Sequence, residues 1–175
     1  MASRPSCVLI DPVPGDLTAL VQQGVPAMTL IRPSLVRIAL GHKAPDGRFE
    51  PDPSGGRWYT VDVVDADDIV FWQRDTGDIA TWDGRAFALG QERIGEAATY
   101  SFDCALNIYA SPLDWLRADR DGIVVLPRQW PRAFDRLRDA PRIAIAESLL
   151  PLYRRHMKPA RMPDLFVIPA RRCAA

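Results

Sequence analysis

Short apolar runs alternate with segments of helical spacing over the last third of the chain. Apolar runs of strand length lie at residues 106–110, 123–127, 142–147 and 165–169. The segments between them repeat apolar residues at the spacing of a helix, so strands and helices alternate. This order is typical of a parallel sheet with crossover helices and predicts a small βαβαβαβ sheet over residues 105–169.

Two of the intervening segments carry further helix signals. Ser111, Pro112 and Asp114 resemble a capping box, in which a hydroxyl residue caps the helix and an acid follows three positions later. The next segment repeats apolar residues that should face the sheet, namely Trp130, Ala133, Phe134 and Leu137. Its charged residues, Arg132 and Arg136 among them, fall outside this stripe and are expected on a solvated face.

Residues 57–89 change to a pattern rich in β-branched and aromatic residues. Turns containing aspartate and glycine separate these runs, as is typical of antiparallel hairpins. The pattern predicts strands at residues 58–64, 69–73 and 79–82, with a weaker strand at 85–89.

The N-terminal part is predicted to hold a helix, two strands and a loop. Asp16 is the expected N-cap of a short helix that Gly24 ends. Residues 27–31 and 35–40 are short apolar runs and are predicted as strands. Residues 41–56 combine glycine, proline and charged residues and are predicted to form a mobile loop.

The 175-residue chain is therefore predicted as α/β in class, α+β overall. An acidic, largely antiparallel β lobe is expected over residues 1–104, and a parallel α/β lobe over 105–169, followed by a tail at 170–175. A chain of this length fits one compact unit.

The net charge of zero conceals a separation of charge along the chain. Residues 46–103 hold 13 acidic and 5 basic side chains, whereas residues 117–172 hold 6 acidic and 13 basic ones. The two lobes can attract each other, or each can meet a partner of opposite charge. A basic surface can bind phosphate or an acidic partner, and an acidic surface can bind a basic protein. We favour the interpretation that the two lobes attract each other within the fold.

Composition excludes several classes of protein and site. No apolar run approaches the ~20 residues of a membrane span, and the N-terminus lacks the pattern of a signal peptide, so a cytoplasmic protein without membrane contact is expected. Cys7, Cys104 and Cys173 are too far apart to suggest a disulfide framework or a zinc site. Cys104 is expected as a small core residue, and no cofactor is expected.

Three tryptophans, Trp58, Trp72 and Trp82, fall on the predicted antiparallel strands. Aromatic residues on strands can stack against bases or sugars. They more often fill the space between a small sheet and its neighbour, and we favour this packing interpretation.

Few residues suggest catalysis. Glu147 follows a predicted parallel strand, where the chemistry of such sheets usually lies, and Asp114 follows another. We interpret Glu147 first as a cap of the next helix. The acidic run of Asp62, Asp65, Asp67 and Asp68 lacks the spacing of a calcium loop and is interpreted as a solvated turn. Phosphate-binding glycine motifs are missing, and no metal site is predicted.

The order of elements over residues 105–169 resembles the Toprim domains of bacterial plasmid and phage primase-like proteins. Such domains hold magnesium through a glutamate after the first strand and an Asp-x-Asp after the third. This chain has Ala110 and Ser111 at the first place, and Glu147, Ser148 and Leu149 at the second. The resemblance therefore implies a Toprim-like domain with a degenerate active site.

The leading functional hypothesis is a non-catalytic accessory or binding protein, expected in a bacterial mobile element. Its contact with phosphate is predicted at Arg154, Arg155, Lys158 and Arg161. One alternative is a metal-dependent phosphoryl-transfer or hydrolytic enzyme that uses Glu147 with Asp114. Another is an inhibitor whose acidic surface binds a nucleic-acid-binding protein. Protein and nucleic acid both remain open as partners, and the oligomeric state is open.

Overall fold

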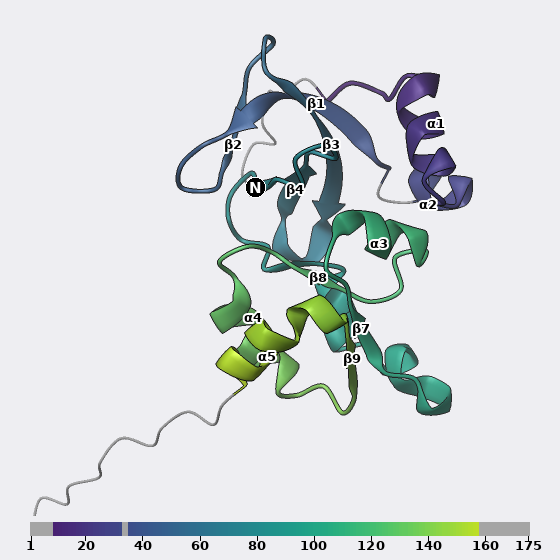
Figure 1. The fold of residues 1–175 in the computed structure, drawn as a ribbon, viewed down its shortest axis with the longest axis vertical. Coiled ribbons are helices and arrows are strands. Elements are labelled where there is room, and N and C mark those ends of the chain that lie inside the picture. Colours follow the sequence, from purple (N-terminus) through teal and green to yellow (C-terminus); the bar gives the residue numbers. More distant parts are fainter. Residues whose placement is uncertain (1–8, 33–34, 158–175) are drawn as a thin grey trace, which may run out of the picture.

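The computed structural model, which describes residues 9–32 and 35–157, is built around a curled antiparallel sheet (Figure 1). A parallel bridge between Arg48 and Thr81 links the two edges of this sheet and curls it further. The five strands lie in the order β2 (Phe49–Pro51), β1 (Arg37–Lys43), β3 (Gly56–Val63), β4 (Asp68–Trp72) and β5 (Ile79–Thr81). The mixed α and β content agrees with the predicted α+β class, and the antiparallel sheet with the predicted N-terminal lobe.

The inner face of the curled sheet holds its own aromatic core. The rings of Phe49 and Phe71 stack at 3.8 Å between centroids, and Trp58 meets Phe49 edge to face at 5.7 Å. The indole N–H of Trp58 donates to the Gly41 carbonyl at 2.9 Å, which satisfies its one polar atom. Trp58 and Trp72 are buried, which agrees with the packing interpretation, whereas Trp82 is half-buried against the same cluster as Trp58.

The other face of the sheet packs against helices from two distant parts of the chain. These are α1 (Pro14–Gln22), α2 (Ala27–Ile31) and α3 (Pro112–Arg117). Leu20 and Leu30 from the first two helices join Trp115 and Leu116 of α3 in one buried cluster. The N-terminal helices therefore cover a sheet face that α3 shares (Figure 1).

The C-terminal lobe contains a parallel strand pair of limited extent. Strand β7 (Leu106–Ile108) pairs in parallel with β9 (Ile143–Ile145), and a parallel bridge joins Ile108 to Ile123. Strand β8 (Val124–Val125) instead pairs antiparallel with β6 (Ala88–Leu89). The predicted regular parallel sheet is thus only partly formed here, because the run after Ile123 turns to the N-terminal lobe. The last predicted strand, residues 165–169, lies outside the described residues.

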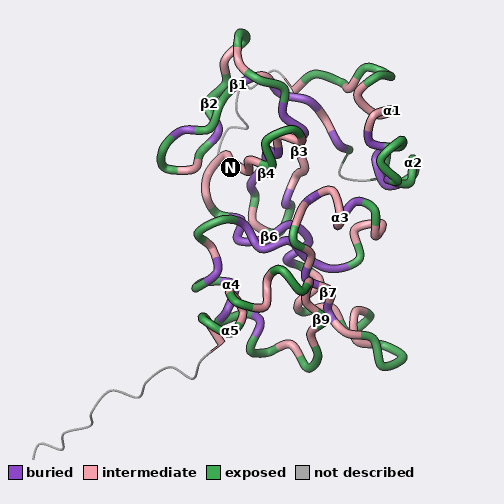
Figure 2. Tube along the Cα trace, viewed as in Figure 1, coloured by how far each residue is buried: buried purple, intermediate pink, exposed green. Residues whose placement is uncertain are grey.

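Helices α4 (Trp130–Leu137) and α5 (Leu150–His156) pack on this lobe, the latter preceded by the 3₁₀ helix η4 (Glu147–Leu149). The predicted stripe of α4 is buried as expected, and its members are Trp130, Ala133, Phe134 and Leu137. Two further 3₁₀ helices, η2 (Gln91–Ile94) and η3 (Ala97–Asp103), lead from β6 to β7. Figure 2 shows buried backbone concentrated where the two lobes meet.

Two predictions for the N-terminal part are wrong. Residues 27–31 form helix α2 and not a strand, since a short apolar run does not by itself distinguish the two and Pro26 starts the helix. Strands occupy much of the segment predicted as a loop at 41–56. A Cβ at Gly41 would clash with the Glu50 carbonyl oxygen, so this glycine permits close strand approach.

Local details also differ from expectation. Helix α1 is capped at Val13, three residues before the predicted Asp16, whose carboxylate accepts from the Val13 N–H at 3.1 Å. Cys104 is exposed at the end of η3 and is not a core residue. None of the helices in the described part of the chain is long and apolar enough to cross a membrane.

Candidate functional site: an arginine-lined pocket

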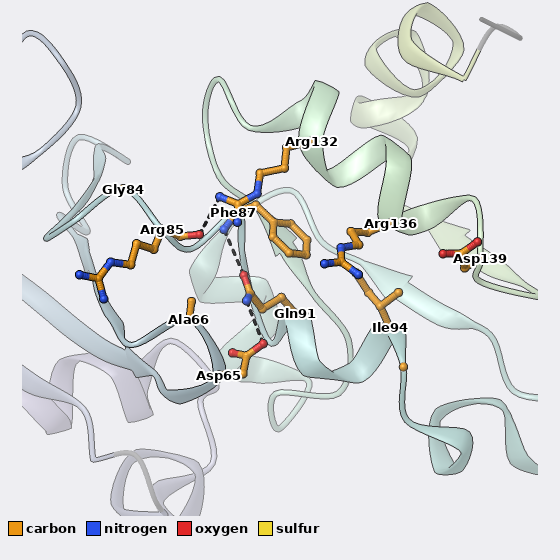
Figure 3. A pocket seen from close by; sticks show the side chains of 11 residues that line it. Asp65, Ala66, Gly84, Arg85, Phe87, Gln91, Ile94, Arg132, Arg136 and Asp139 are labelled. Atoms are coloured by element: carbon orange, nitrogen blue, oxygen red, sulfur yellow. Dashed lines mark hydrogen bonds between the residues drawn. The ribbon is translucent and has the colours of Figure 1, made fainter. Parts of the chain in front are cut away.

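An open pocket of about 710 Å³ lies where α4 faces the turn before β6 and the 3₁₀ helix η2 (Figure 3). Arg132 and Arg136 line it from α4, and Arg85, Phe87 and Gln91 line it from the opposite chain segment. The pocket is therefore formed by segments that are far apart in sequence. Its volume falls within the ~300–1,000 Å³ typical of sites for small molecules.

The positions of Arg132 and Arg136 follow from the register of α4. The two residues are four apart, so both side chains lie on the same side of the helix, turned away from the centre of the buried stripe. Burial of Phe134 and Leu137 fixes the rotation of the helix and leaves both arginines exposed towards the pocket.

Arg132 is held against the opposite wall. Its Nη1 donates to the Arg85 carbonyl oxygen at 2.8 Å, and its guanidinium lies 5.5 Å from the centre of the Phe87 ring. The contact with the ring is a cation–π interaction, which orients the guanidinium plane. Arg132 retains further N–H donors, because a guanidinium carries five.

Arg136 is the least engaged cation of the pocket. Its side chain makes no hydrogen bond and no ion pair with any residue that the structure describes. All five of its N–H donors are thus open to a ligand. Figure 3 shows its guanidinium directed into the space between α4 and η2.

Gln91 stabilises the side of the pocket opposite these arginines through three hydrogen bonds. Its Oε1 accepts from the backbone N–H of Phe87 at 3.0 Å and of Ala88 at 3.4 Å, while its Nε2 donates to Asp65 Oδ2 at 2.8 Å. Because Gln91 is buried, these bonds satisfy an amide that would otherwise be costly to bury. They also tie the turn after β3 to the start of β6.

Asp68 anchors the segment that carries Arg85. Its buried carboxylate accepts four backbone hydrogen bonds, from the N–H groups of Ile69, Asp83, Arg85 and Ala86, at 2.7 to 2.9 Å. The Arg85 guanidinium turns back towards Asp67 at 3.1 Å and Asp83 at 3.0 Å. The charge of Arg85 is thereby compensated, so α4 supplies the cations available to a ligand.

The predicted solvated acidic turn is correct only in part. Asp65 and Asp67 are exposed, but Asp68 is buried and structural. No group of three or more His, Cys, Asp or Glu side chains suited to hold a metal occurs within residues 9–32 and 35–157.

The predicted catalytic candidates lie elsewhere, after the carboxyl ends of β7 and β9. Glu147 is exposed at the start of η4, where no side-chain cap bond is formed. Asp114 completes the predicted cap of α3. It accepts from the Ser111 hydroxyl at 2.7 Å and pairs with Arg117 at 3.1 Å.

Arg154 and Arg155, the predicted phosphate contacts, are exposed in the last turn of α5. Helix α5 packs on the Phe134 side of α4, where the Phe134 and Tyr153 rings are 6.1 Å apart. Helical spacing places Arg136 on nearly the opposite flank of α4. The two predicted contacts are thus separated from the pocket by α4, and their companions Lys158 and Arg161 lie outside the described residues.

Sequence reasoning missed the pocket because its parts come from separate segments. A signal was present in Arg132 and Arg136, two cations four residues apart beside an apolar stripe, but it equally fits a solvated helix face. Comparisons with protein-family models, curated proteins and solved structures gave no match to this chain.

Proposed function

We propose that this protein acts by binding nucleic acid, and that a backbone phosphate enters the arginine-lined pocket. The observation that carries the proposal is the pair of α4 arginines, with Arg136 unengaged among the described residues and Arg132 oriented by Phe87. Guanidinium groups bind phosphate through paired, charge-assisted hydrogen bonds, which makes arginine well suited to this ligand.

The position of the arginines supports a polymeric ligand over an isolated anion. Arg132 and Arg136 lie on one flank of α4, and the exposed Arg154 and Arg155 belong to the helix packed on the other flank. A nucleic-acid strand that crosses α4 would meet both pairs of cations with different phosphates, since a helix is about 10–12 Å across. Each neutralised phosphate releases counterions and adds to affinity, and this contribution weakens as salt rises.

The exposure of the pocket to solvent determines the affinity for nucleic acid that we expect. Both pocket arginines are exposed, so each contact is screened by water and salt. Affinity should therefore be moderate and strongly salt-dependent, as is usual for contacts that do not read sequence.

The test is fluorescence anisotropy of labelled single- and double-stranded DNA with the full chain across a salt series. The double variant Arg132→Gln, Arg136→Gln should weaken binding by about tenfold or more at low salt, equivalent to ~1.4 kcal/mol. The variant Arg48→Gln, Arg74→Gln removes the same charge from the antiparallel sheet and should leave binding nearly unchanged.

Arg154→Gln with Arg155→Gln tests the second flank in the same assay. A partial loss of DNA affinity is expected for this variant if the nucleic-acid strand crosses α4. Absence of salt-dependent binding, or equal losses for the pocket and the sheet variants, would contradict the proposal.

The place of the protein in the cell is proposed from the Toprim resemblance alone. We propose a cytoplasmic accessory of a bacterial mobile element, with a degenerate Toprim-like lobe over residues 105–169. Co-purification of the tagged full chain with plasmid or phage DNA from cells carrying such an element would support this, and its fractionation with membranes would contradict it.

A further inference from the structure

A second pocket, of about 360 Å³, adjoins the arginine-lined pocket at the turn before β6. Gly84 lines both pockets, so the two lie on either side of this residue. In Figure 3, Gly84 is at one end of the arginine-lined pocket and Asp139 is at the other. The space beside α4 therefore continues past Gly84 into a second pocket, which we call the Arg128 pocket.

The Arg128 pocket lies where the antiparallel sheet meets the segment that leads into α4. Strand β5 lines one side of it, and residues 126–129 line the other. Lys43 and the turn at residues 46–48 complete the lining. The Arg128 pocket thus combines segments from both lobes, as the arginine-lined pocket does.

Most of the charges in the Arg128 pocket are compensated within the fold. Its basic side chains, among the described residues, are Lys43, Arg48 and Arg128. Lys43 pairs with Asp78 at 3.2 Å, and Arg48 pairs with Asp46 at 3.6 Å. These two cations are therefore poor candidates for binding a ligand.

Arg128 is the cation that remains for a ligand in this pocket. It makes no ion pair with any residue that the structure describes, and its Nη1 donates to the Pro45 carbonyl oxygen at 3.2 Å. Its φ of +66° is a costly conformation for a residue with a side chain, and strain of this kind often occurs at functional sites. The last acid of the lining, Asp83, pairs with Arg85 at 3.0 Å and does not neutralise Arg128.

We infer that the ligand is a single strand of nucleic acid that runs beside α4, with one phosphate in the arginine-lined pocket and another at Arg128. This inference rests on the proposed function, because it extends the same strand into the second pocket. A positively charged path along the backbone is the usual way in which proteins bind single strands without reading their sequence. The guanidinium of Arg128 suits a phosphate for the same reason as those of Arg132 and Arg136.

The position of Gly84 favours a single strand over a duplex. The ligand has to bend over the turn that separates the two pockets, and an unpaired strand bends easily. A DNA duplex is stiff, with a persistence length of ~150 bp, and cannot follow such a short path. At the other end of the path, the strand can turn at Arg136 across α4 towards Arg154 and Arg155.

The test compares single strands of two lengths, because a short one fills the arginine-lined pocket without reaching Arg128. Labelled thymidine oligonucleotides of ~3 and ~12 nucleotides are titrated with the full chain at low salt by fluorescence anisotropy. Arg128→Gln should weaken binding of the longer strand about fivefold and leave that of the shorter strand unchanged. The matched control Arg74→Gln, which removes a charge outside both pockets, should change neither affinity.

Arg128→Gly separates loss of the phosphate contact from loss of the fold. Glycine adopts positive φ without strain, so this variant should melt no lower than the Arg128→Gln variant and bind the longer strand as weakly. A duplex of ~12 base pairs should bind more weakly than the single strand of that length.

The outcomes distinguish this inference from the proposed function. If Arg132→Gln with Arg136→Gln weakens binding but Arg128→Gln does not, the strand does not reach the Arg128 pocket and only this inference fails. An equal loss for both strand lengths, or tighter binding of the duplex, would also overturn it. If neither strand binds at low salt, this inference and the proposed function both fail.

Discussion

The Asp68 carboxylate accepts a hydrogen bond from the backbone N–H of Arg85 at 2.7 Å, although the two residues are 17 positions apart. The same carboxylate accepts three further backbone N–H groups. A buried anion surrounded by donors fixes the path of the chain that follows β5. That path leads directly into Phe87 and the wall of the arginine-lined pocket.

Replacing Asp68 by asparagine should destabilise the fold. The amide has nearly the same shape, but its NH₂ group donates and would face backbone N–H groups that also donate. We expect the free energy of unfolding to fall by about 2–4 kcal/mol, measured by urea denaturation. Asp75→Asn, at an exposed surface position, should change it by less than ~0.5 kcal/mol. Equal effects of the two substitutions would show that the Asp68 bonds contribute little.

Gly90 allows the two lobes to approach closely. Its φ is +67°, and a Cβ there would clash with the Gly122 carbonyl oxygen. Gly90→Ala should therefore combine backbone strain with a steric clash and lower stability by about 2–4 kcal/mol.

Gly77→Ala provides the matched comparison for Gly90. Gly77 has a similar φ of +74°, but nothing lies within 4 Å of the position that an alanine methyl group would occupy. Only the conformational cost of ~1 kcal/mol is expected there. Equal melting temperatures for the two alanine variants would show that the lobes adjust without cost.

Asp119 should make stability depend on pH below neutrality. The buried Thr29 hydroxyl donates to its carboxylate, and with Arg32 nearby this holds the pKa of Asp119 below its ordinary value. A carboxyl with a lowered folded-state pKa stabilises the fold above its unfolded-state pKa of ~3.9. This stabilisation is lost as pH falls through the lowered folded-state pKa.

Thr29→Val removes the hydroxyl while keeping the shape of the buried side chain. The variant should be less stable than the wild type by about 1 kcal/mol at pH 7, and urea denaturation should show this gap narrowing below pH ~4. A gap that stays constant down to acid pH would assign the effect to packing of Thr29 and not to Asp119.

Arg136 should account for about one phosphate contact. Arg136→Gln is expected to reduce the slope of log affinity against log salt by ~1, because one fewer counterion is released. Arg136→Lys should keep that slope, since the charge remains, but weaken binding through loss of the paired guanidinium geometry. DNA titrations at several salt concentrations measure both, and an unchanged slope in the glutamine variant would exclude this contact.

Local patterns predict much of the fold because neighbouring residues determine them. The strands β3, β4 and β5 and the buried stripe of α4 follow from periodicity, and the Ser111 cap of α3 from spacing over three residues. The strand prediction for α2 is wrong because an apolar run of five residues fits a helix or a strand equally. The hypothesis of a site at Glu147 and Asp114 pointed to the carboxyl ends of β7 and β9, whereas the pocket lies elsewhere.

The sequence by itself determined the α+β class, the antiparallel lobe and the accumulation of arginines in the C-terminal third, since these depend on composition and local order. Only the tertiary structure decided which arginines face a pocket. Arg132 meets Phe87 because burial of α4 rotates that helix, and Asp68 holds the opposite wall from β4. Such contacts join residues tens of positions apart, and their geometry arises only when separate apolar faces pack together.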